Sequence, residues 1–363
     1  MNGFSRPLWQ ELYFNLQERL WEKYQTCLKS LPGFSIIKNF YNSEKFLRIS
    51  MDAEHKAILE KQHNYITGRH SAVKVCTWTK KSLKDEGSCY KEQFYGIRSH
   101  LCAQVSTTVG HCPNRCIFCW RPMEYTQTKE IDEPDEPDKV IENSIRGQQI
   151  LISGLGGYEG LNKEKFQEAQ EPMHFAISLT GEPFMYPKLG ELIEKLHARG
   201  KSTFVVSNGM YPKKIRQLRT LPTQLYLSVD APDEAIFKDV DRSTLTDGWQ
   251  RLNKSLEILS DLRGKTRSTL RLTMIKNFNM HNAQGWGELL KKANPLFVEV
   301  KAYMFVGYSR LRLTIENMPM HYEVKEFAQK IAQHSGYKII DEKEGSRVVL
   351  LMKEDYDGRV MKF

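Results

Sequence analysis

The chain has 363 residues, a length that allows two domains or one large domain with appendages. A hydrophobic content of 40% and a charged content of 27% exclude collagen-like, low-complexity and wholly disordered proteins. The net charge of +9 suits a polyanionic partner, although many basic proteins bind no nucleic acid. No segment approaches the ~20 apolar residues of a membrane span, and the N-terminus lacks a signal-peptide pattern. We therefore expect a cytoplasmic protein without a membrane partner.

The N-terminal part of the sequence predicts helix. Residues 8–30 place apolar residues at helical spacing among charges, and Cys27 in this segment is expected to be a small core residue. Residues 31–70 predict loops and a short helix. We therefore expect residues 1–70 to form a helical N-terminal extension.

Strand and helix patterns alternate from residue 100 onward. The expected strands are 101–109, 174–183, 202–209, 224–230, 268–276 and 296–305, and a final pair covers 337–341 and 346–353. The expected helices are 139–156, 189–200, 246–264, 283–293 and 321–336. The acidic, proline-rich connection 131–140 is expected to be a solvated surface turn. Five or six successive strand–helix units indicate an α/β protein with a complete or partial barrel, whose active site lies at the carboxyl ends of the strands.

Six of the seven cysteines fall within 44 residues, at 76, 89, 102, 112, 116 and 119. Disulfides are not expected in a large cytosolic protein, and clustered thiols in a reducing compartment more often bind metal or carry out redox chemistry. The clustering therefore indicates a metal centre.

The sequence GHCPNRCIFCW places Cys112, Cys116 and Cys119 in a C-x3-C-x2-C pattern directly after the first expected barrel strand. Three close thiolates can hold an iron–sulfur cluster and leave one iron open to a further ligand. Zinc is the alternative, but structural zinc takes four protein ligands and no matching motif follows.

A second group lies upstream, where Cys76, Cys89 and Cys102 are each 13 residues apart. These residues could be structural core cysteines. However, Cys76 and Cys89 lie in a polar segment with little apolar periodicity, and three ligands again suggest a [4Fe–4S] cluster with one open iron.

The C-x3-C-x2-C motif resembles the signature of the radical S-adenosylmethionine (SAM) superfamily, in which the aromatic residue before the last cysteine, here Phe118, is expected to contact the cofactor. The resemblance implies that the open iron chelates SAM and that one electron cleaves SAM to a 5′-deoxyadenosyl radical. Other segments look like SAM contacts at successive strand ends, although each one alone could be an ordinary turn or cap. They are Gly181 and Glu182 in LTGEP for the SAM amino group, and Ser207, Asn208, Ser228 and Asp230 for the ribose and methionyl groups.

The spacing of both cysteine groups, with Lys91 two residues after Cys89, resembles 4-demethylwyosine synthases. The segments HCPNRCIFCWRPME and VEVKAYMFVGYSRLRL strengthen the resemblance, which covers roughly residues 70–355. It implies a partial (β/α)6-type TIM barrel of the radical SAM superfamily. The expected organisation is a helical extension (1–70), an auxiliary cluster-binding segment (71–100) and a radical SAM core with a C-terminal elaboration (101–363).

The resemblance also implies a reaction. A radical SAM carbon–carbon lyase of this family condenses 1-methylguanosine-37, in the anticodon loop of tRNA-Phe, with C2 and C3 of pyruvate to form 4-demethylwyosine. It uses two [4Fe–4S] clusters, and Lys91 would form a Schiff base with pyruvate. Composition alone suggests a surface lysine, because Lys80, Lys81 and Lys84 are close by.

The electron source is expected to be external. The eukaryotic form carries an N-terminal flavodoxin domain, for which 70 helical residues are too few. We therefore expect the archaeal-type stand-alone form, without FMN, acting as a monomer with a flavodoxin or ferredoxin as its one-electron donor.

Two other functions remain open at this point. Another two-cluster radical SAM enzyme that modifies RNA, such as a methylthiotransferase, would insert sulfur rather than two carbons. A non-catalytic iron–sulfur RNA-binding protein would produce no 5′-deoxyadenosine from SAM.

Overall fold

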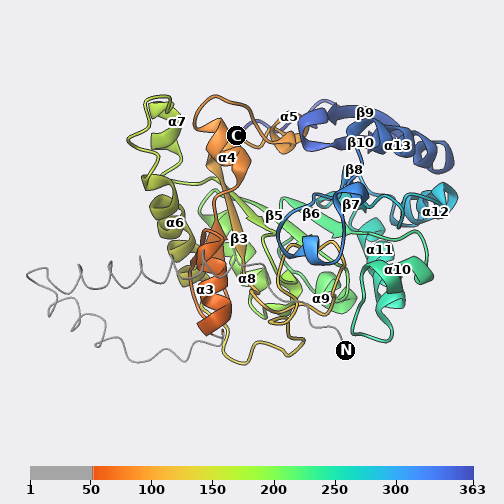
Figure 1. The fold of residues 1–363 in the computed structure, drawn as a ribbon, viewed down its shortest axis with the longest axis horizontal. Helices are drawn as coiled ribbons and strands as arrows, with labels where there is room; N and C mark the ends of the chain where they lie inside the picture. The colour runs from red at the N-terminus through yellow and green to blue at the C-terminus, as the bar shows by residue number, and fades with distance from the viewer. Residues whose placement is uncertain (1–50, 52) are drawn as a thin grey trace, which may run out of the picture. The chain divides into compact units, whose positions relative to one another are not determined.

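A ten-stranded mixed sheet organises the chain in a computed structural model that describes residue 51 and residues 53–363 (Figure 1). Its centre consists of six parallel strands that follow one another in chain order. They are β3 (Cys102–Ser106), β4 (His174–Ile177), β5 (Ser202–Ser207), β6 (Gln224–Ser228), β7 (Arg267–Met274) and β8 (Phe297–Ala302). Within the described residues the two edge strands of the sheet do not pair, so the sheet is not closed. The expected partial barrel is confirmed.

Two antiparallel pairs extend the parallel strands. The hairpin of β1 (Asn64–Ile66) and β2 (Ala72–Lys74) joins β3, and β10 (Val348–Met352) joins β8 and carries β9 (Lys338–Lys343). The helix expected over 8–30, with Cys27, lies outside the described residues.

The described end of the expected N-terminal extension differs from the prediction. It contains α3 (Ala53–Lys61), which agrees with the expected short helix, but it also contains β1, which belongs to the sheet. Strands of three residues are too short for an alternating pattern to reveal them.

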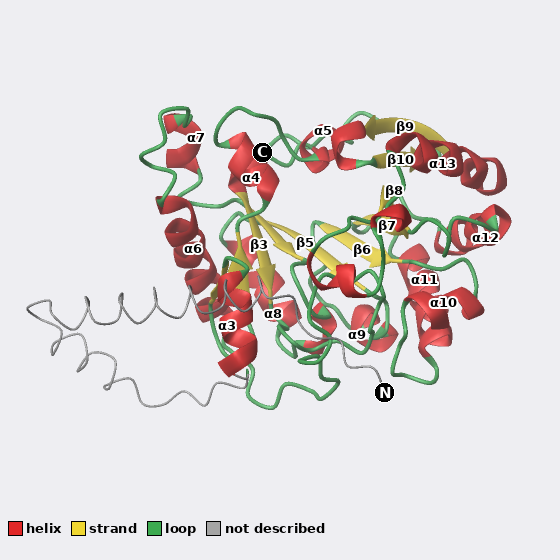
Figure 2. Cartoon of the chain, viewed as in Figure 1, coloured by secondary structure: helices red, strands yellow, loops and turns green. Residues whose placement is uncertain are grey.

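Helices connect the parallel strands and cover the outer face of the sheet (Figure 2). They are α6 (Pro137–Ser153), α7 (Lys163–Glu168), α8 (Leu189–Ala198), α9 (Pro212–Arg216), α10 (Glu234–Val240), α11 (Gly248–Asp261), α12 (Ala283–Ala293) and α13 (His321–Ser335). Their apolar sides form the main core with the outward faces of the strands; Leu192, Ile193 and Leu196 of α8 are examples. None of the described helices is both long and apolar enough to span a membrane.

A second, aromatic core fills the inside of the barrel near the amino ends of the strands. Phe204, Tyr226 and Phe297 point inward from β5, β6 and β8 and pack with Tyr90 and Tyr95. These two tyrosines are the first and last residues of α5 (Tyr90–Tyr95), which follows α4 (Thr77–Ser82). The barrel interior therefore holds α5 at the end opposite the expected SAM loop.

Residues 356–363 close the same end. The Met361 amide donates to the Tyr95 carbonyl (2.9 Å), and the Phe363 ring meets His174 edge-on at 4.4 Å between ring centroids. Gly96 has a positive φ of 80°, and a Cβ there would lie 2.0 Å from the Met361 carbonyl oxygen. Figure 1 accordingly places the C-terminal end beside α4 and α5.

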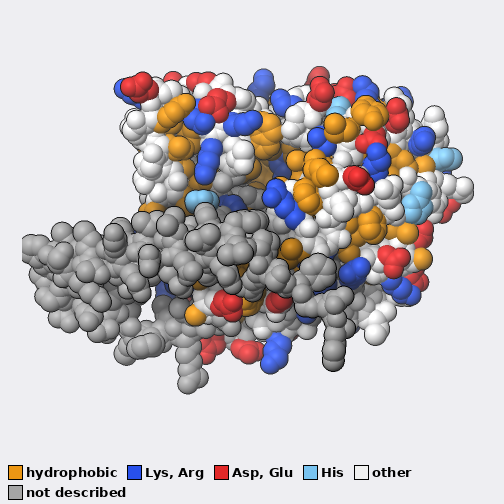
Figure 3. Space-filling model, viewed as in Figure 1, with side chains coloured by type: hydrophobic (Ala, Val, Ile, Leu, Met, Phe, Trp, Pro, Cys, Tyr) orange, Lys and Arg blue, Asp and Glu red, His pale blue; other side chains and the backbone are white. Residues whose placement is uncertain are grey.

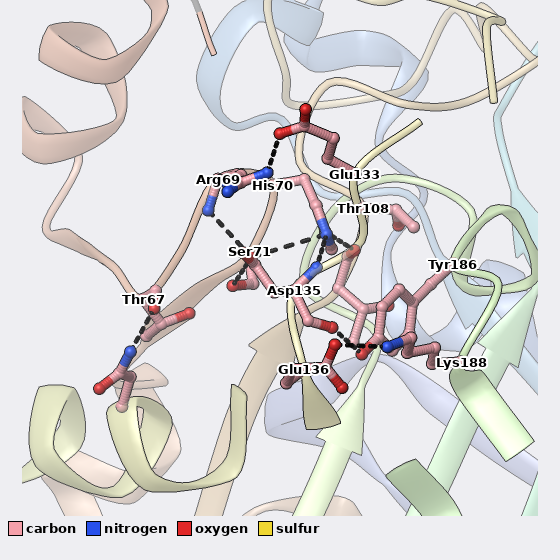
Figure 4. A network of polar contacts seen from close by, with 12 residues as sticks. Thr67, Arg69, His70, Ser71, Thr108, Glu133, Asp135, Glu136, Tyr186 and Lys188 are labelled. Atoms are coloured by element: carbon pink, nitrogen blue, oxygen red, sulfur yellow. Dashed lines mark hydrogen bonds and ion pairs between the residues drawn. The ribbon is translucent and has the colours of Figure 1, made fainter. Parts of the chain in front are cut away.

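The acidic connection before α6 is anchored to the β1–β2 hairpin rather than simply solvated (Figure 4). His70 is buried, and its Nδ1 lies 2.6 Å from the Thr107 carbonyl oxygen while its Nε2 accepts the Asp135 amide (2.8 Å). The Asp135 carboxylate accepts the Arg69 amide (2.9 Å), and the Arg69 guanidinium pairs with Glu133. This network fixes the chain that leads from β3 toward the cysteine loop.

Candidate active site

The loop after β3 carries Cys112, Cys116 and Cys119, and backbone hydrogen bonds fix it on both sides. The Cys112 amide donates to the Gln127 carbonyl (3.0 Å), and the Ile117 amide donates to the Val240 carbonyl (2.9 Å). The loop is thus held over the carboxyl ends of the strands.

Polar side chains surround these thiols. Arg121 Nε donates to Cys119 Sγ (3.0 Å), and Asn208 Nδ2 lies 3.6 Å from Cys112 Sγ. Although burial lowers the pKa of Arg121, the nearby Cys119 and Cys112 thiols raise it above the ordinary value. A permanently charged guanidinium beside these sulfurs favours their thiolate forms, which are the forms that bind metal.

Burial itself acts in the opposite direction. It raises the pKa of the Cys112 thiol and places that of the Cys116 thiol well above its usual range, where Asp241 adds to the effect. The Cys116 thiol lies 3.6 Å from Asp241 Oδ1. These sulfurs therefore favour the neutral form until a metal displaces their protons.

The donor set suits a cluster. None of the described residues forms a group of three His, Cys, Asp or Glu side chains that could hold a single metal ion. The charges of Cys112 and Cys119 nevertheless raise the pKa of Cys116, so the three sulfurs lie within electrostatic reach of one another. In a cubane cluster each cysteine binds a different iron, which spaces the sulfurs more widely than around one ion.

A cavity of about 280 Å³ lies beside this loop and is lined by the ends of β4, β5 and β6. It brings together all the residues expected to contact SAM: Phe118, Gly181, Glu182, Ser207, Asn208, Ser228 and Asp230. Phe118 also packs on a small apolar cluster that contains Ile117 and Tyr303.

Glu182 connects two strand ends. Its carboxylate accepts hydrogen bonds from the Ser207 hydroxyl (2.8 Å), the Asn208 amide (2.7 Å) and the Phe184 amide (3.1 Å). Burial raises the pKa of Glu182 to about 7, against the effect of these donors. Glu182 and Ser207 are thus bonded to each other, and their contacts shape the cavity wall.

Backbone atoms beside the cavity also constrain Gly181 and Asp230. Gly181 has a φ of 79°, and a Cβ there would lie 1.9 Å from the Thr108 carbonyl oxygen, so only glycine fits. Asp230 accepts the Thr273 amide (3.0 Å), and burial raises its pKa to about 6.

The second cysteine group lies at the opposite end of β3. Cys76 and Cys89 are the residues that precede α4 and α5, and Cys102 is the first residue of β3. Ser99 joins these segments, because its hydroxyl accepts the Cys89 amide (2.9 Å) and its carbonyl accepts the Thr79 hydroxyl (3.0 Å).

The three thiols of this group also act on one another. Burial raises the pKa of Cys89 to about 11 and that of Cys102 to about 12, and the charge of Cys76 adds to both shifts. None of the six described cysteines forms a disulfide. The chain therefore brings together two separate sets of three free thiols.

Lys91 points into the aromatic core beside the second group. Its Nζ lies 4.6 Å from the centroid of the Tyr226 ring and 5.8 Å from that of Phe204. Its charge lowers the pKa of both Cys102 and Cys89 against the effect of burial. Lys91 is thus partly buried, with its amine over the aromatic core, unlike an exposed surface lysine.

Comparison with known proteins identifies the family. Residues 106–290 match the model of the radical SAM superfamily, and residues 292–353 match a model described as wyosine base formation. A Pyrococcus abyssi protein named S-adenosyl-L-methionine-dependent tRNA 4-demethylwyosine synthase is 48% identical over 85% of this chain and 91% of that protein. The chain belongs to the 4-demethylwyosine synthase family of radical SAM enzymes.

Solved structures of family members agree with the assignment. A structure described as TYW1 with a lysine–pyruvate adduct bound has a TM-score of 0.77 and 37% identity, and covers 86% of this chain and 99% of that chain. A crystal structure described as archaeal TYW1 has a TM-score of 0.71 and 35% identity, with 86% and 100% covered. As a radical SAM family member, the chain uses SAM and a [4Fe–4S] cluster. The methylthiotransferase alternative is not favoured.

Several charged residues beside the thiols and inside the barrel were not predicted to be site residues. Arg121 and Asp241 contact thiols of the cysteine loop after β3, while Arg271, Glu299 and Lys301 project from β7 and β8 into the barrel. In FVEVKA the charged residues alternate with valines, and this period of two could have identified them as facing inward.

Proposed function

We propose that this chain condenses 1-methylguanosine-37 of tRNA-Phe with C2 and C3 of pyruvate to form 4-demethylwyosine. The observation that carries the proposal is the arrangement of two cysteine triads at opposite ends of β3, both beside one barrel interior. From Cys102 to Ser106 the strand spans roughly 13 Å at 3.3 Å per residue. Two cofactor sites at this spacing leave room between them for small substrates.

Cys112, Cys116 and Cys119 would hold the SAM-binding cluster, and Cys76, Cys89 and Cys102 a second one. The first cluster and SAM together supply the radical chemistry. The chain's own part is positioning: Glu182 fixes the ends of β4 and β5, and Asn208 contacts the Cys112 sulfur.

Lys91 is the residue we assign to pyruvate. Its amine would attack the C2 carbonyl, and loss of water would give an imine. Its place over Tyr226, beside the second cysteine group, supports this role. Lys301 also faces the interior, so the peptide that carries the adduct must be identified.

tRNA would approach the mouth of the SAM cavity. Met304 and Val306 line the cavity and are 41% and 45% exposed, while the neighbouring Arg310 and Leu311 are also exposed. Figure 3 shows hydrophobic side chains next to Lys or Arg on the face that carries the loop after β8. Apolar side chains with adjacent cations suit a single-stranded RNA loop whose base is turned out of its stack.

The deciding experiment is anaerobic incubation of reconstituted enzyme with SAM, dithionite, labelled pyruvate and tRNA containing 1-methylguanosine-37. Nucleoside mass spectrometry should detect 4-demethylwyosine carrying two pyruvate carbons. Sulfur insertion, or 5′-deoxyadenosine without tricyclic product, would contradict the proposal. About eight irons per chain would support two clusters. A reduced flavodoxin or ferredoxin should support the same reaction when it is supplied in place of dithionite.

The lysine assignment has its own test. Borohydride reduction with labelled pyruvate, followed by peptide mapping, should place the adduct on the peptide that contains Lys91. The adduct should be absent from Lys91→Ala. An adduct on the peptide containing Lys301 would contradict the assignment.

A further inference from the structure

Arg271 is a cation inside the barrel. It lies on β7 and lines the SAM cavity. Among the described residues no side chain forms a hydrogen bond or an ion pair with its guanidinium, although Glu299 and Asp230 act on it electrostatically from farther away. Arg271 is partly buried, and its guanidinium donors are free to bind an anion that enters the cavity.

Lys301 adds a second positive charge on the neighbouring strand. In the register of the sheet, the backbone of Arg271 lies opposite that of Glu299 on β8. Lys301 is two residues further along β8 and on the same face. Its Nζ donates to the Ser346 carbonyl and lies over the Tyr90 ring. Burial, and next the charge of Arg271, lower the pKa of Lys301 to about 8. The two cations therefore repel each other in a poorly solvated place, and a shared anion would relieve that repulsion.

The Glu299 carboxylate does not serve as the anion shared by Arg271 and Lys301. Glu299 is fully buried, and its two oxygens accept the hydroxyls of Tyr90 (2.8 Å) and Tyr95 (2.9 Å). It is thus committed to α5, while Arg271 and Lys301 keep their positions on the cavity.

The surroundings connect this cation pair to Lys91. Arg271 acts on the pKa of Tyr226, the ring over which Lys91 Nζ lies. Lys301 lies over Tyr90, the residue between Cys89 and Lys91. The pair is therefore between the SAM cavity and the second cysteine group.

We infer that Arg271 and Lys301 bind the carboxylate of the 2-oxo acid co-substrate and hold its C2 carbonyl toward Lys91. This inference rests on the proposed function. The methionyl group of SAM also carries a carboxylate. The co-substrate is favoured because Lys301 Nζ lies over the ring of Tyr90, the residue directly before Lys91.

The first test is equilibrium dialysis of reconstituted enzyme against labelled pyruvate. Arg271→Met should raise the dissociation constant about 10- to 100-fold, as loss of a charge-assisted hydrogen bond predicts, and Arg271→Lys should raise it less. Methyl pyruvate, which lacks the negative charge, should compete poorly in the wild type and with a smaller disadvantage relative to pyruvate in Arg271→Met, where only Lys301 remains. Lys276→Met is the matched control, because Lys276 is an exposed cation after β7 that pairs with Glu323.

The outcomes separate this inference from the proposed function. Unchanged pyruvate binding in both Arg271→Met and Lys301→Met would overturn the carboxylate site while leaving adduct formation at Lys91 intact. Weaker SAM binding with unchanged pyruvate binding would assign the pair to SAM and also overturn it. Arg271-dependent binding without any adduct would support the site and reject the Lys91 imine. If Arg271→Met does not fold, as judged by circular dichroism and iron content, Arg271→Lys and Lys301→Met carry the same comparison.

Discussion

Glu299 should be the residue that connects the stability of the barrel to the second cysteine group. Its carboxylate is buried and accepts two phenol hydroxyls from α5, the helix that Cys89 precedes and that contains Lys91. Each buried hydrogen bond to a charged group contributes about 1.5–3 kcal/mol. Glu299→Leu removes both bonds and leaves two buried hydroxyls unpaired, so we expect a loss of about 3–5 kcal/mol.

Thermal unfolding monitored by circular dichroism should detect this loss as a decrease in Tm of about 5–10 °C. Tyr95→Phe removes only one of the two bonds and should cost roughly half as much. Iron bound after reconstitution should also fall toward half in Glu299→Leu, because α5 loses its anchor beside Cys89. Glu288→Gln on the exposed side of α12 is the control and should change neither quantity. Wild-type Tm and iron content in Glu299→Leu would refute the reasoning.

Three further predictions address the cysteine groups, a glycine and a histidine. Cys89→Ala should lose about half of its iron and the tricyclic product while retaining uncoupled SAM cleavage, measured as 5′-deoxyadenosine; normal product from a single cluster would contradict this. Gly181→Ala should be strongly destabilised in urea unfolding because its methyl group would meet the Thr108 carbonyl. Gly200→Ala is the control: Gly200 has a φ of 69° but open space around it, so its free energy of unfolding should fall by only about 1 kcal/mol. Burial lowers the pKa of His174 to about 3. Between pH 6.5 and 3 the imidazole is therefore protonated in the unfolded state but not in the folded state. The free energy of unfolding should accordingly fall as the pH is lowered through this range. His174→Gln should therefore show a weaker pH dependence of unfolding free energy than the wild type over that range, and identical slopes would exclude His174 as the cause.

The barrel strands and the position of the cysteine loop after β3 could be predicted from the sequence because their signals are local. Apolar segments such as 202–209 and 224–230 end in polar residues, and parallel strands bring those ends to one edge of the sheet. The helix expected over 283–293 has the same bounds as α12, where the Asn282 side chain accepts the Gly285 amide and so caps the helix start.

Interactions between distant segments could not be predicted in this way. The β1–β2 hairpin forms because β3 offers it an edge, and the acidic connection is anchored because His70 lies opposite Asp135. Likewise, Glu299 meets Tyr90 across more than 200 residues of sequence. Such pairings depend on tertiary contacts that no local pattern contains.

The closure of the barrel by residues 356–363 has a consequence for the order of events during synthesis. Tyr95 gains its contacts with Glu299 and Met361 only after those two residues have left the ribosome. The strand–helix units from β3 to β7 can pair earlier, since each one adds to its predecessor in sequence. The contacts around Cys76, Cys89 and Cys102 are therefore completed late, and insertion of the proposed second cluster should follow synthesis of residues 356–363.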